Sequence, residues 1–425
     1  MGFLIIAVMA VGVVLMLTRT LPTAFALVFL AVAIALLSGA SLLGKTNSVA
    51  TTVLQTGAPM LASTMIAILL GSWLGAVLDD TGIASTLVRK IVEFGGERPS
   101  VVALGVFGVS LLVGTITGSA PAALLAGVVG IPAMIAVGVP NVVAAGTVLM
   151  GISAGLPLEL IGWQFLSDAL SIPVETVRSF QLRLFPIVLV VGIAYVLVEC
   201  RRKGARHAWA LRTTPASRRA RRGDAPWYSL LTPVVPIVLA LGFAMPIVPA
   251  LLLGLAYALL STYKRGELKE RALRTLYKAF EVAAPPIVLF IAIGMLLAAV
   301  KLPGAIAALN PIVSSISPSN PVLFVVVFSV LVPLALYRGP LNIYGLGAGV
   351  AGVLISGGVY PATAVLGMMA SLGQVLGVSD PTSTQTVWSA QYAGARPERV
   401  MVSTLPYTWL IAVGGLTMTS LLYLT

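Results

Sequence analysis

The sequence predicts an all-α polytopic membrane protein with two inverted-topology repeats. About ten transmembrane spans are expected, two of them broken helices, together with two re-entrant hairpins. Of the 425 residues, 58% are hydrophobic and 9% are charged, and the mean hydropathy is +1.03. Apolar runs long enough for a bilayer core recur along the whole chain. The same order of elements occurs on both sides of a basic segment at 201–228, which predicts the repeat.

The first repeat is expected at 1–200. After three spans and an amphipathic arm, two apolar runs flank the polar sequence TITGSAP. Arms of about 14–17 residues are short for a span and suit a hairpin that turns inside the membrane. A helix interrupted at GISAGLPLELIGW follows, and paired interruptions of this kind mark transporter binding sites. The expected elements are spans at about 3–18, 21–40 and 58–78, a hairpin at about 100–137, a broken helix at about 141–170 and a last span at 184–200.

The second repeat is expected at 229–425, after the basic linker at 201–228. It has the same order, with YRGPLN at the turn of its hairpin and GVSDPTSTQTVW at the interruption of its broken helix. The expected elements are spans at about 229–245, 247–262 and 282–300, a hairpin at about 321–357, a broken helix at about 361–390 and a final span at about 400–424.

The placement of positive charge predicts the topology. Nine Lys and Arg side chains fall between Arg201 and Arg222, and a second basic group follows Lys264. Basic loops beside spans are typical of the cytoplasmic side, so the net charge of +12 indicates orientation and not nucleic-acid binding. With this side inside, the two repeats have opposite orientations. We expect a bacterial inner-membrane protein whose 201–228 loop is cytoplasmic.

Several functional classes lack their signatures. Cys200 and His207 are the single cysteine and the single histidine, so neither a Cys-based metal site nor a Ser-His-Asp set is expected. The sequence contains no H-E-x-x-H and no P-loop. We therefore expect no enzyme, no cofactor and no metal other than Na⁺, with Na⁺ or H⁺ as coupling ion. A channel is the rival class, but inverted repeats with hairpins favour alternating access.

Helix interruptions persist in a membrane where they line a cavity buried in protein. Half-helix N-termini there favour anions, and unwound carbonyls can hold a cation. Substrate-binding candidates are Thr117, Gly118, Ser119, Arg338, Gly339, Asn342, Ser379, Thr382, Ser383 and Thr384. Candidates for the coupling-ion site are Ser153, Gly155, Glu159 and Asp380.

Charged residues in this region allow more than one interpretation. Arg338 suits a bidentate contact with a substrate carboxylate, but an internal ion pair or a guanidinium reaching the membrane surface also fits. Asp380 can bind Na⁺, carry a proton, or cap the half-helix after the Asp-Pro pair. Glu159 is either a coupling carboxylate or an interfacial one. Asp79 and Asp80 are expected to be a solvated interfacial pair.

The chain resembles the ion transporter superfamily and, within it, the gluconate permease (gluconate:H⁺ symporter) family. The resemblance lies in LGSWLGAVLDDTGIASTLVRKI and LGVSDPTSTQTVW, while TGSAPAALLAG is similar to the membrane subunit of tripartite carboxylate transporters. It implies symport of a small organic anion with H⁺ or Na⁺ by an elevator-type mechanism, in a homodimer. The alternatives are the membrane component of a binding-protein-dependent transporter, an ion exchanger, or a channel.

Overall fold

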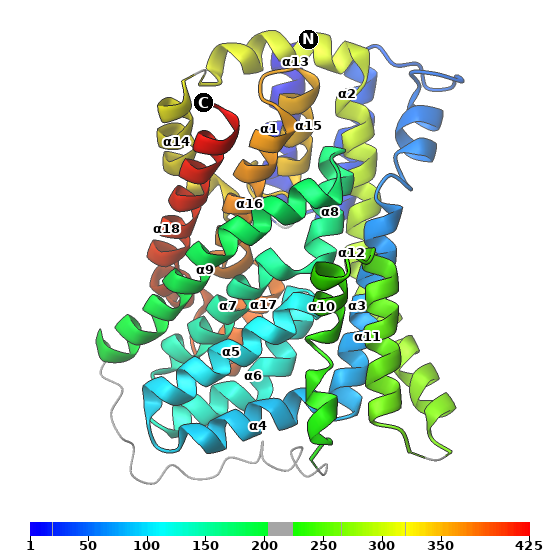
Figure 1. Cartoon of the computed structure of the whole chain (residues 1–425). Coiled ribbons are helices and arrows are strands. Elements are labelled where there is room, and N and C mark those ends of the chain that lie inside the picture. The colour runs from blue at the N-terminus through cyan, green and yellow to red at the C-terminus, as the bar shows by residue number, and fades with distance from the viewer. Residues whose placement is uncertain (19, 203–223, 265, 319) are drawn as a thin grey trace.

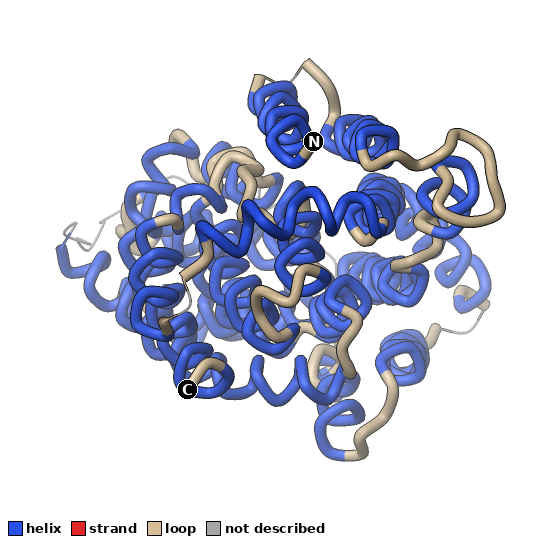
Figure 2. The backbone as a smooth tube through the Cα atoms, turned by 90° about the horizontal axis from the view of Figure 1, so that it is seen from above, coloured by secondary structure: helices blue, strands red, loops and turns tan. Residues whose placement is uncertain are grey.

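The structure is a computed structural model that describes residues 1–18, 20–202, 224–264, 266–318 and 320–425. Within these ranges the chain forms helices and loops (Figures 1 and 2). Most of the predicted basic linker falls outside the described residues. Among the described residues, seven helical segments are long and apolar enough to cross a membrane. They are α3 (Ala62–Asp80), α5 (Pro99–Thr117), α7 with η2 (Asn141–Leu158), α9 (Val174–Arg202), α12 (Leu268–Val300), α16 with α17 (Ala362–Tyr392) and α18 (Pro397–Tyr423).

Other predicted spans are shorter helices. The prediction for 21–40 corresponds to a helix of 15 residues, α2. The expected span at 229–245 is wrong as one continuous helix: it contains a 3-10 turn and an eight-residue helix. Pro233 and Pro236 explain this, because proline lacks the N–H that a helix interior needs. The shorter helices here are α1 (Gly2–Leu17), α2 (Thr23–Leu37), η1 (Val49–Thr56), η4 (Trp227–Leu231), α10 (Val235–Gly242) and α11 (Ile247–Ser261).

The predicted amphipathic arm is α4 (Ile83–Gly95). It begins after Gly82, whose φ of 75° lets the chain turn sharply at the end of α3. Ile83 and Val88 are buried against the bundle, whereas Lys90 lies on the opposite, solvent-facing side. The corresponding arm in the second half is α13 (Pro303–Ile316). In Figure 1, α4 lies along the lower edge of the molecule and α13 along the upper edge.

The first hairpin consists of α5 and α6 (Ser119–Ala136), which meet at Gly118. Its limits agree with the expected 100–137, but its arms of 19 and 18 residues are longer than predicted. The polar sequence at the tip does not end the helix early. Thr115 and Thr117 donate their hydroxyls to backbone carbonyls of the preceding turn, so they remain helical. The turn itself is confined to Gly118, with φ 73° and ψ 163°.

The second hairpin has shorter helices and a longer turn. Its arms are α14 (Pro321–Val330), extended by η5 (Val332–Ala335), and α15 (Leu346–Ser356). Between them, Tyr337 and Arg338 both adopt left-handed backbone conformations, with φ of 53° and 57°. Such values are uncommon for residues with a side chain. In Figure 1 this hairpin lies in the upper half of the molecule, and α5 and α6 lie in the lower half.

Close packing brings the first broken helix against the first hairpin. A Cβ on Gly151 would lie 2.5 Å from the carbonyl oxygen of Phe107, and one on Gly155 would lie 2.5 Å from that of Leu111. The G-x-x-x-G spacing places both glycines on one face of α7, so the backbones of α5 and α7 can approach closely. The predicted coupling-site residue Gly155 therefore has a packing role.

Candidate functional site

The helix breaks in the two halves occupy matching positions. In the first half, α7 (Asn141–Gly155) is followed by η2 (Leu156–Leu158), Glu159 and α8 (Leu160–Leu170). In the second, α16 (Ala362–Ser379) is followed by a turn that begins at Asp380 and by α17 (Thr384–Tyr392). Residues with equivalent places in the two halves are 221 positions apart in the sequence. The pairs are Gly118 and Gly339 at the hairpin turns, Pro140 and Pro361 before the helices, and Glu159 and Asp380 at the breaks.

A buried hydrogen bond joins one of these matching pairs directly. Ser153 Oγ donates to Gln374 Oε1 at 2.6 Å, and both residues are buried. The contact therefore joins residues at equivalent sequence positions of α7 and α16. The sequence patterns did not single out Gln374, although its 221-position offset from Ser153 was a signal that could have identified it.

Asp380 organises the turn at the second break. Its Oδ1 accepts hydrogen bonds from the backbone N–H of Thr382 at 2.8 Å and from the Thr382 hydroxyl at 2.6 Å. Its Oδ2 accepts from the backbone N–H of Arg338 at 3.4 Å. Asp380 thus forms an Asx turn and holds the tip of the second hairpin. Of the predicted roles, capping is the one with visible contacts, although the residue at the N-cap of α17 is Ser383.

Most polar groups of GVSDPTSTQTVW stabilise the break itself. Gln385 Nε2 donates to the Gly377 carbonyl and Thr386 Oγ1 donates to the Val378 carbonyl, each at 2.9 Å. Ser379 Oγ shares hydrogen bonds with two hydroxyls of α18, at 2.9 and 2.8 Å. These side chains satisfy backbone and hydroxyl groups that are buried in the protein. Thr384 differs, because it is exposed at the start of α17.

Glu159 lies at the first break in a different environment. Its residue surface is 5% exposed, and its carboxyl forms no hydrogen bond or ion pair among the described residues. It lies beside the first hairpin, because a Cβ on Gly118 would be 3.8 Å from Glu159 Oε1. Tyr344, which follows the turn of the second hairpin, is near enough for its ionised form to be repelled by an ionised Glu159. Glu159 is thus a buried carboxyl beside the first hairpin, and both of its predicted roles stay predictions.

Arg338 extends from the second hairpin to a different part of the molecule. Its Nη1 donates to the hydroxyl of Thr23, on the first turn of α2, at 3.2 Å. Among the described residues no carboxylate lies within ion-pair distance of its guanidinium, so the predicted internal ion pair is absent from this set. Its role toward a substrate stays a prediction. Asn342 closes the hairpin turn by accepting from the Tyr344 N–H at 3.0 Å.

The remaining candidates lie at the hairpin tips and within the breaks. Thr117 is buried and its hydroxyl is bonded to its own helix. Ser119 is the first residue of α6, and its side chain is outside the described set. Gly339 packs so tightly that a Cβ at this position would overlap the Leu334 carbonyl oxygen. The two breaks adjoin each other, because a Cβ on Gly377 would lie 3.1 Å from the side chain of Leu156.

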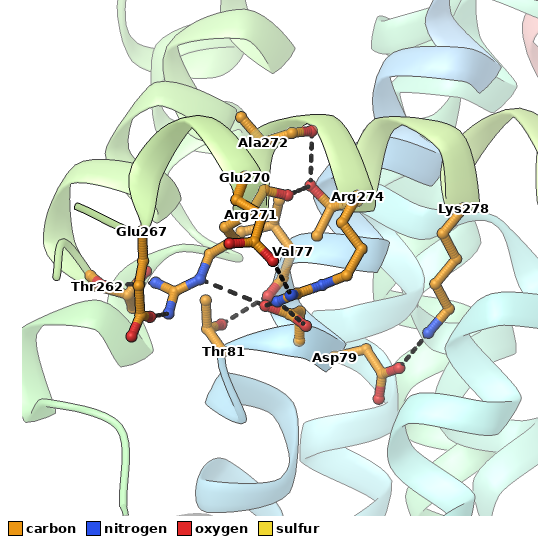
Figure 3. A network of polar contacts seen from close by, with 12 residues as sticks. Val77, Asp79, Thr81, Thr262, Glu267, Glu270, Arg271, Ala272, Arg274 and Lys278 are labelled. Carbon is orange, nitrogen blue, oxygen red and sulfur yellow. Dashed lines mark hydrogen bonds and ion pairs between the residues drawn. The ribbon is translucent and has the colours of Figure 1, made fainter.

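Asp79 and Asp80 belong to an ion network away from the breaks (Figure 3). Asp80 is 13% exposed and pairs with Arg271 at 3.3 Å and with Arg274 at 2.9 Å. Asp79 is half-exposed and pairs with Lys278 at 2.5 Å. The expected solvated pair is therefore wrong for Asp80. The network joins the end of α3 to the start of α12 and borders a cavity of about 420 Å³.

The cavity beside the ion network and the helix breaks are distinct regions. The cavity is lined by a mixture of carboxylates and cations that already neutralise one another. We base the candidate site on the breaks, because unwound backbone within a membrane occurs where protein or a water-filled path surrounds it. Within the described ranges, no group of three or more His, Cys, Asp or Glu side chains could hold a metal ion.

The fold is that of an all-α, multi-pass membrane protein with paired hairpins and paired broken helices. It is similar to the crystal structure of the Alcanivorax borkumensis YdaH transporter, described as having an unusual topology. The TM-score is 0.61 at 15% sequence identity, and the alignment covers 96% of this chain and 97% of that chain. No family model matches the sequence, and no curated protein matches it. The likeness shows a shared fold, and the transport function and the gluconate permease resemblance stay predictions.

Proposed function

We propose that this protein is a secondary active transporter of small organic anions, such as sugar acids or carboxylates, coupled to H⁺ or Na⁺. The observation that carries the proposal is the pair of adjoining helix breaks. Each has a buried carboxylate beside a hairpin tip, at positions 221 residues apart. Paired interruptions near the midplane are the usual setting of transporter binding sites. The similarity to the YdaH transporter supports the same class.

The proposed architecture consists of inverted repeats at 1–200 and 229–425, joined by the 201–228 linker. The opposite positions of α4 and α13 in Figure 1 support it, as does the contact between Ser153 and Gln374. In the proposed elevator mechanism, hairpins, broken helices, α9 and α18 move together. Helices α2, α3, α11 and α12 form the scaffold, because they pack mainly against one another. The homodimer stays a proposal that rests on the family resemblance.

An anionic substrate suits the charge at the second hairpin. Arg338 lies at the tip of the second hairpin, and among the described residues its guanidinium contacts a hydroxyl but forms no ion pair with a carboxylate. An arginine inside a membrane protein is costly unless it meets an anion or water. Helix α6 begins at the tip of the first hairpin and α17 begins at the second break, and the N-terminus of a helix carries partial positive charge.

The proposed location is a bacterial inner membrane with the basic linker in the cytoplasm. Helix α4, the end of α9 and the starts of α12 and α18 all lie toward the lower end of Figure 1. Several basic residues outside the linker belong to these elements, including Arg89 on α4, Lys278 on α12 and Arg399 on α18. The positive-inside rule then identifies this end as cytoplasmic.

Other functions would give different results in the same assay. A membrane component that depends on a periplasmic binding protein would transport nothing when reconstituted alone. An ion exchanger would transport inorganic ions, and a channel would equilibrate its substrate without accumulating it. Purified protein should therefore be reconstituted into liposomes and tested with a panel of labelled carboxylates, with pH and Na⁺ gradients varied independently. Saturable accumulation of an anion above its equilibrium level supports the proposal, and failure with every anion would overturn it.

A further inference from the structure

The two carboxylates at the breaks hold matching positions but have unequal surroundings. Asp380 accepts three hydrogen bonds, from Thr382 and from the backbone of Arg338. Glu159 is buried beside Gly118 and accepts none from the described residues. Glu159 follows Ser153, and Asp380 follows Gln374, by the same six positions in the sequence. The difference between the two carboxylates therefore lies in their local contacts.

Unequal surroundings give two carboxyl groups different chemistry. A buried carboxylate is costly when it lacks donors and a counter-charge, whereas the neutral acid can occupy such a place at a much lower cost. Acid and base roles in a site commonly divide between two groups whose environments differ in this way. Asp380 is fixed in its turn by its donors. Glu159 is held where loss or gain of a proton would change its interaction with both hairpins.

The electrostatic surroundings of Glu159 come from several elements. Helices α3, α5, α7, α9, α11, α15 and α16 pack against η2 or α8. Tyr344, just before α15, is the titratable side chain that interacts electrostatically with Glu159. Asp168, on α8 itself, is held by the Thr64 hydroxyl at 2.7 Å. The other charged side chains on these elements form no ion pair with Glu159 among the described residues: Asp79, Asp80, Glu175, Arg178, Arg183, Glu199, Arg201 and Arg202.

We infer that Glu159 is the proton-carrying group of the transport cycle and that the coupling ion is H⁺. The inference rests on the proposed transport function and selects one of its two coupling ions. A proton from water on one side binds a Glu159 carboxylate oxygen when the site is open to that side. Neutral Glu159 allows the hairpins to close around it, and the same proton returns to water on the other side. The proton that enters therefore leaves unchanged, and no other reactant is consumed.

The first test needs no substrate. Infrared spectra of the purified protein in lipid should show a C=O band of a protonated carboxylic acid at neutral pH. Glu159→Gln should remove that band, while Glu175→Gln, an exposed change in the first turn of α9, should leave it. A band that persists in Glu159→Gln would overturn the inference, and so would the absence of the band from the wild-type protein.

The second test uses liposomes that contain the protein and the anion found in the panel assay. Glu159→Gln should retain exchange of labelled for unlabelled anion but lose accumulation driven by a pH gradient, to the level of empty liposomes. Glu159→Asp should recover part of the accumulation, because it restores a carboxyl group. Unchanged accumulation in Glu159→Gln, or wild-type uptake driven by Na⁺ and not by pH, would refute proton coupling. If no anion is transported, the proposed function fails, while the infrared test still decides the protonation of Glu159.

Discussion

The polar side chains of the second break form hydrogen bonds with the backbone of the same break, and Thr386 allows a test of how much these bonds stabilise the protein. Its side chain is fully buried, and its hydroxyl donates to the Val378 carbonyl at 2.9 Å. Thr386→Val keeps the size and β-branching of the side chain but removes this donor. The Val378 carbonyl lies where α16 ends, so it has lost the ladder partner that a continuous helix would supply. The substitution therefore leaves a polar backbone group in an apolar environment.

The expected cost follows from two ranges. A buried group left without a hydrogen bond costs roughly 1–3 kcal/mol in proteins generally. Hydrogen bonds between helices in membranes average about 0.6 kcal/mol, with a maximum near about 1.7 kcal/mol. We expect Thr386→Val to lower the free energy of unfolding by about 1–1.5 kcal/mol. The Val378 carbonyl is buried in the folded protein, but in the unfolded state within the membrane it also finds hydrogen-bond partners, which reduces the cost.

The assay is equilibrium unfolding in mixed micelles with increasing dodecyl sulfate, followed by circular dichroism. Thr384→Val provides the matched control, since Thr384 is two positions away, exposed, and makes no hydrogen bond among the described residues. The control should stay within about 0.5 kcal/mol of the wild type, as surface changes usually do. Equal stability of the two variants would refute the view that this polar segment mainly satisfies its own backbone.

Three further predictions concern ion pairing, the symmetry contact and the substrate site. Asp80→Asn should lower stability by about 2 kcal/mol, because it removes one of the two carboxylates paired with the buried Arg271 and leaves only Glu267. Asp79→Asn should cost less than about 1 kcal/mol, because its pair with Lys278 is exposed. Equal effects in thermal unfolding would contradict the network of Figure 3. A double-mutant cycle with Ser153→Ala and Gln374→Leu should show a coupling of about 1 kcal/mol in the same unfolding assay, and additive effects would mean that the hydrogen bond contributes nothing. Arg338→Ala should raise the apparent KM for an anion by roughly 10- to 100-fold, which is the loss of affinity expected for a charge-assisted hydrogen bond. Arg338→Lys should raise the KM less, because it keeps the positive charge. An unchanged KM would show that this side chain is not part of the substrate site.

The sequence predicted the order of elements better than their lengths. Apolar runs and Gly/Pro interruptions located both hairpins and both broken helices within a few residues. Length depended on interactions that composition does not reveal. Thr115 and Thr117 read as loop residues, yet their hydroxyls bond to their own helix and extend α5. Pro233, in the turn before α10, and Pro236, in its first turn, shortened a predicted span because neither has an N–H to donate to a continuous helix.

The site residues were harder to predict because a polar side chain can serve the backbone or a ligand. Ser379 and Thr382 are occupied by bonds within the protein, to α18 and to Asp380. Gln374 was overlooked because it lies inside an apolar helix with no local interruption. Its role became visible only when α16 was placed against α7. Glu159 was assigned two roles from sequence, and its burial beside the first hairpin is a fact of packing that composition could not reveal.

The central claim is that the two helix breaks form a site for coupled transport of a small organic anion. The most direct measurement is uptake of labelled carboxylates into liposomes that contain the purified protein, under separately imposed pH and Na⁺ gradients. The account predicts saturable accumulation of at least one anion under an imposed pH gradient and no accumulation when that gradient is collapsed. Uptake that never exceeds equilibrium, or no uptake of any anion tested, would contradict it.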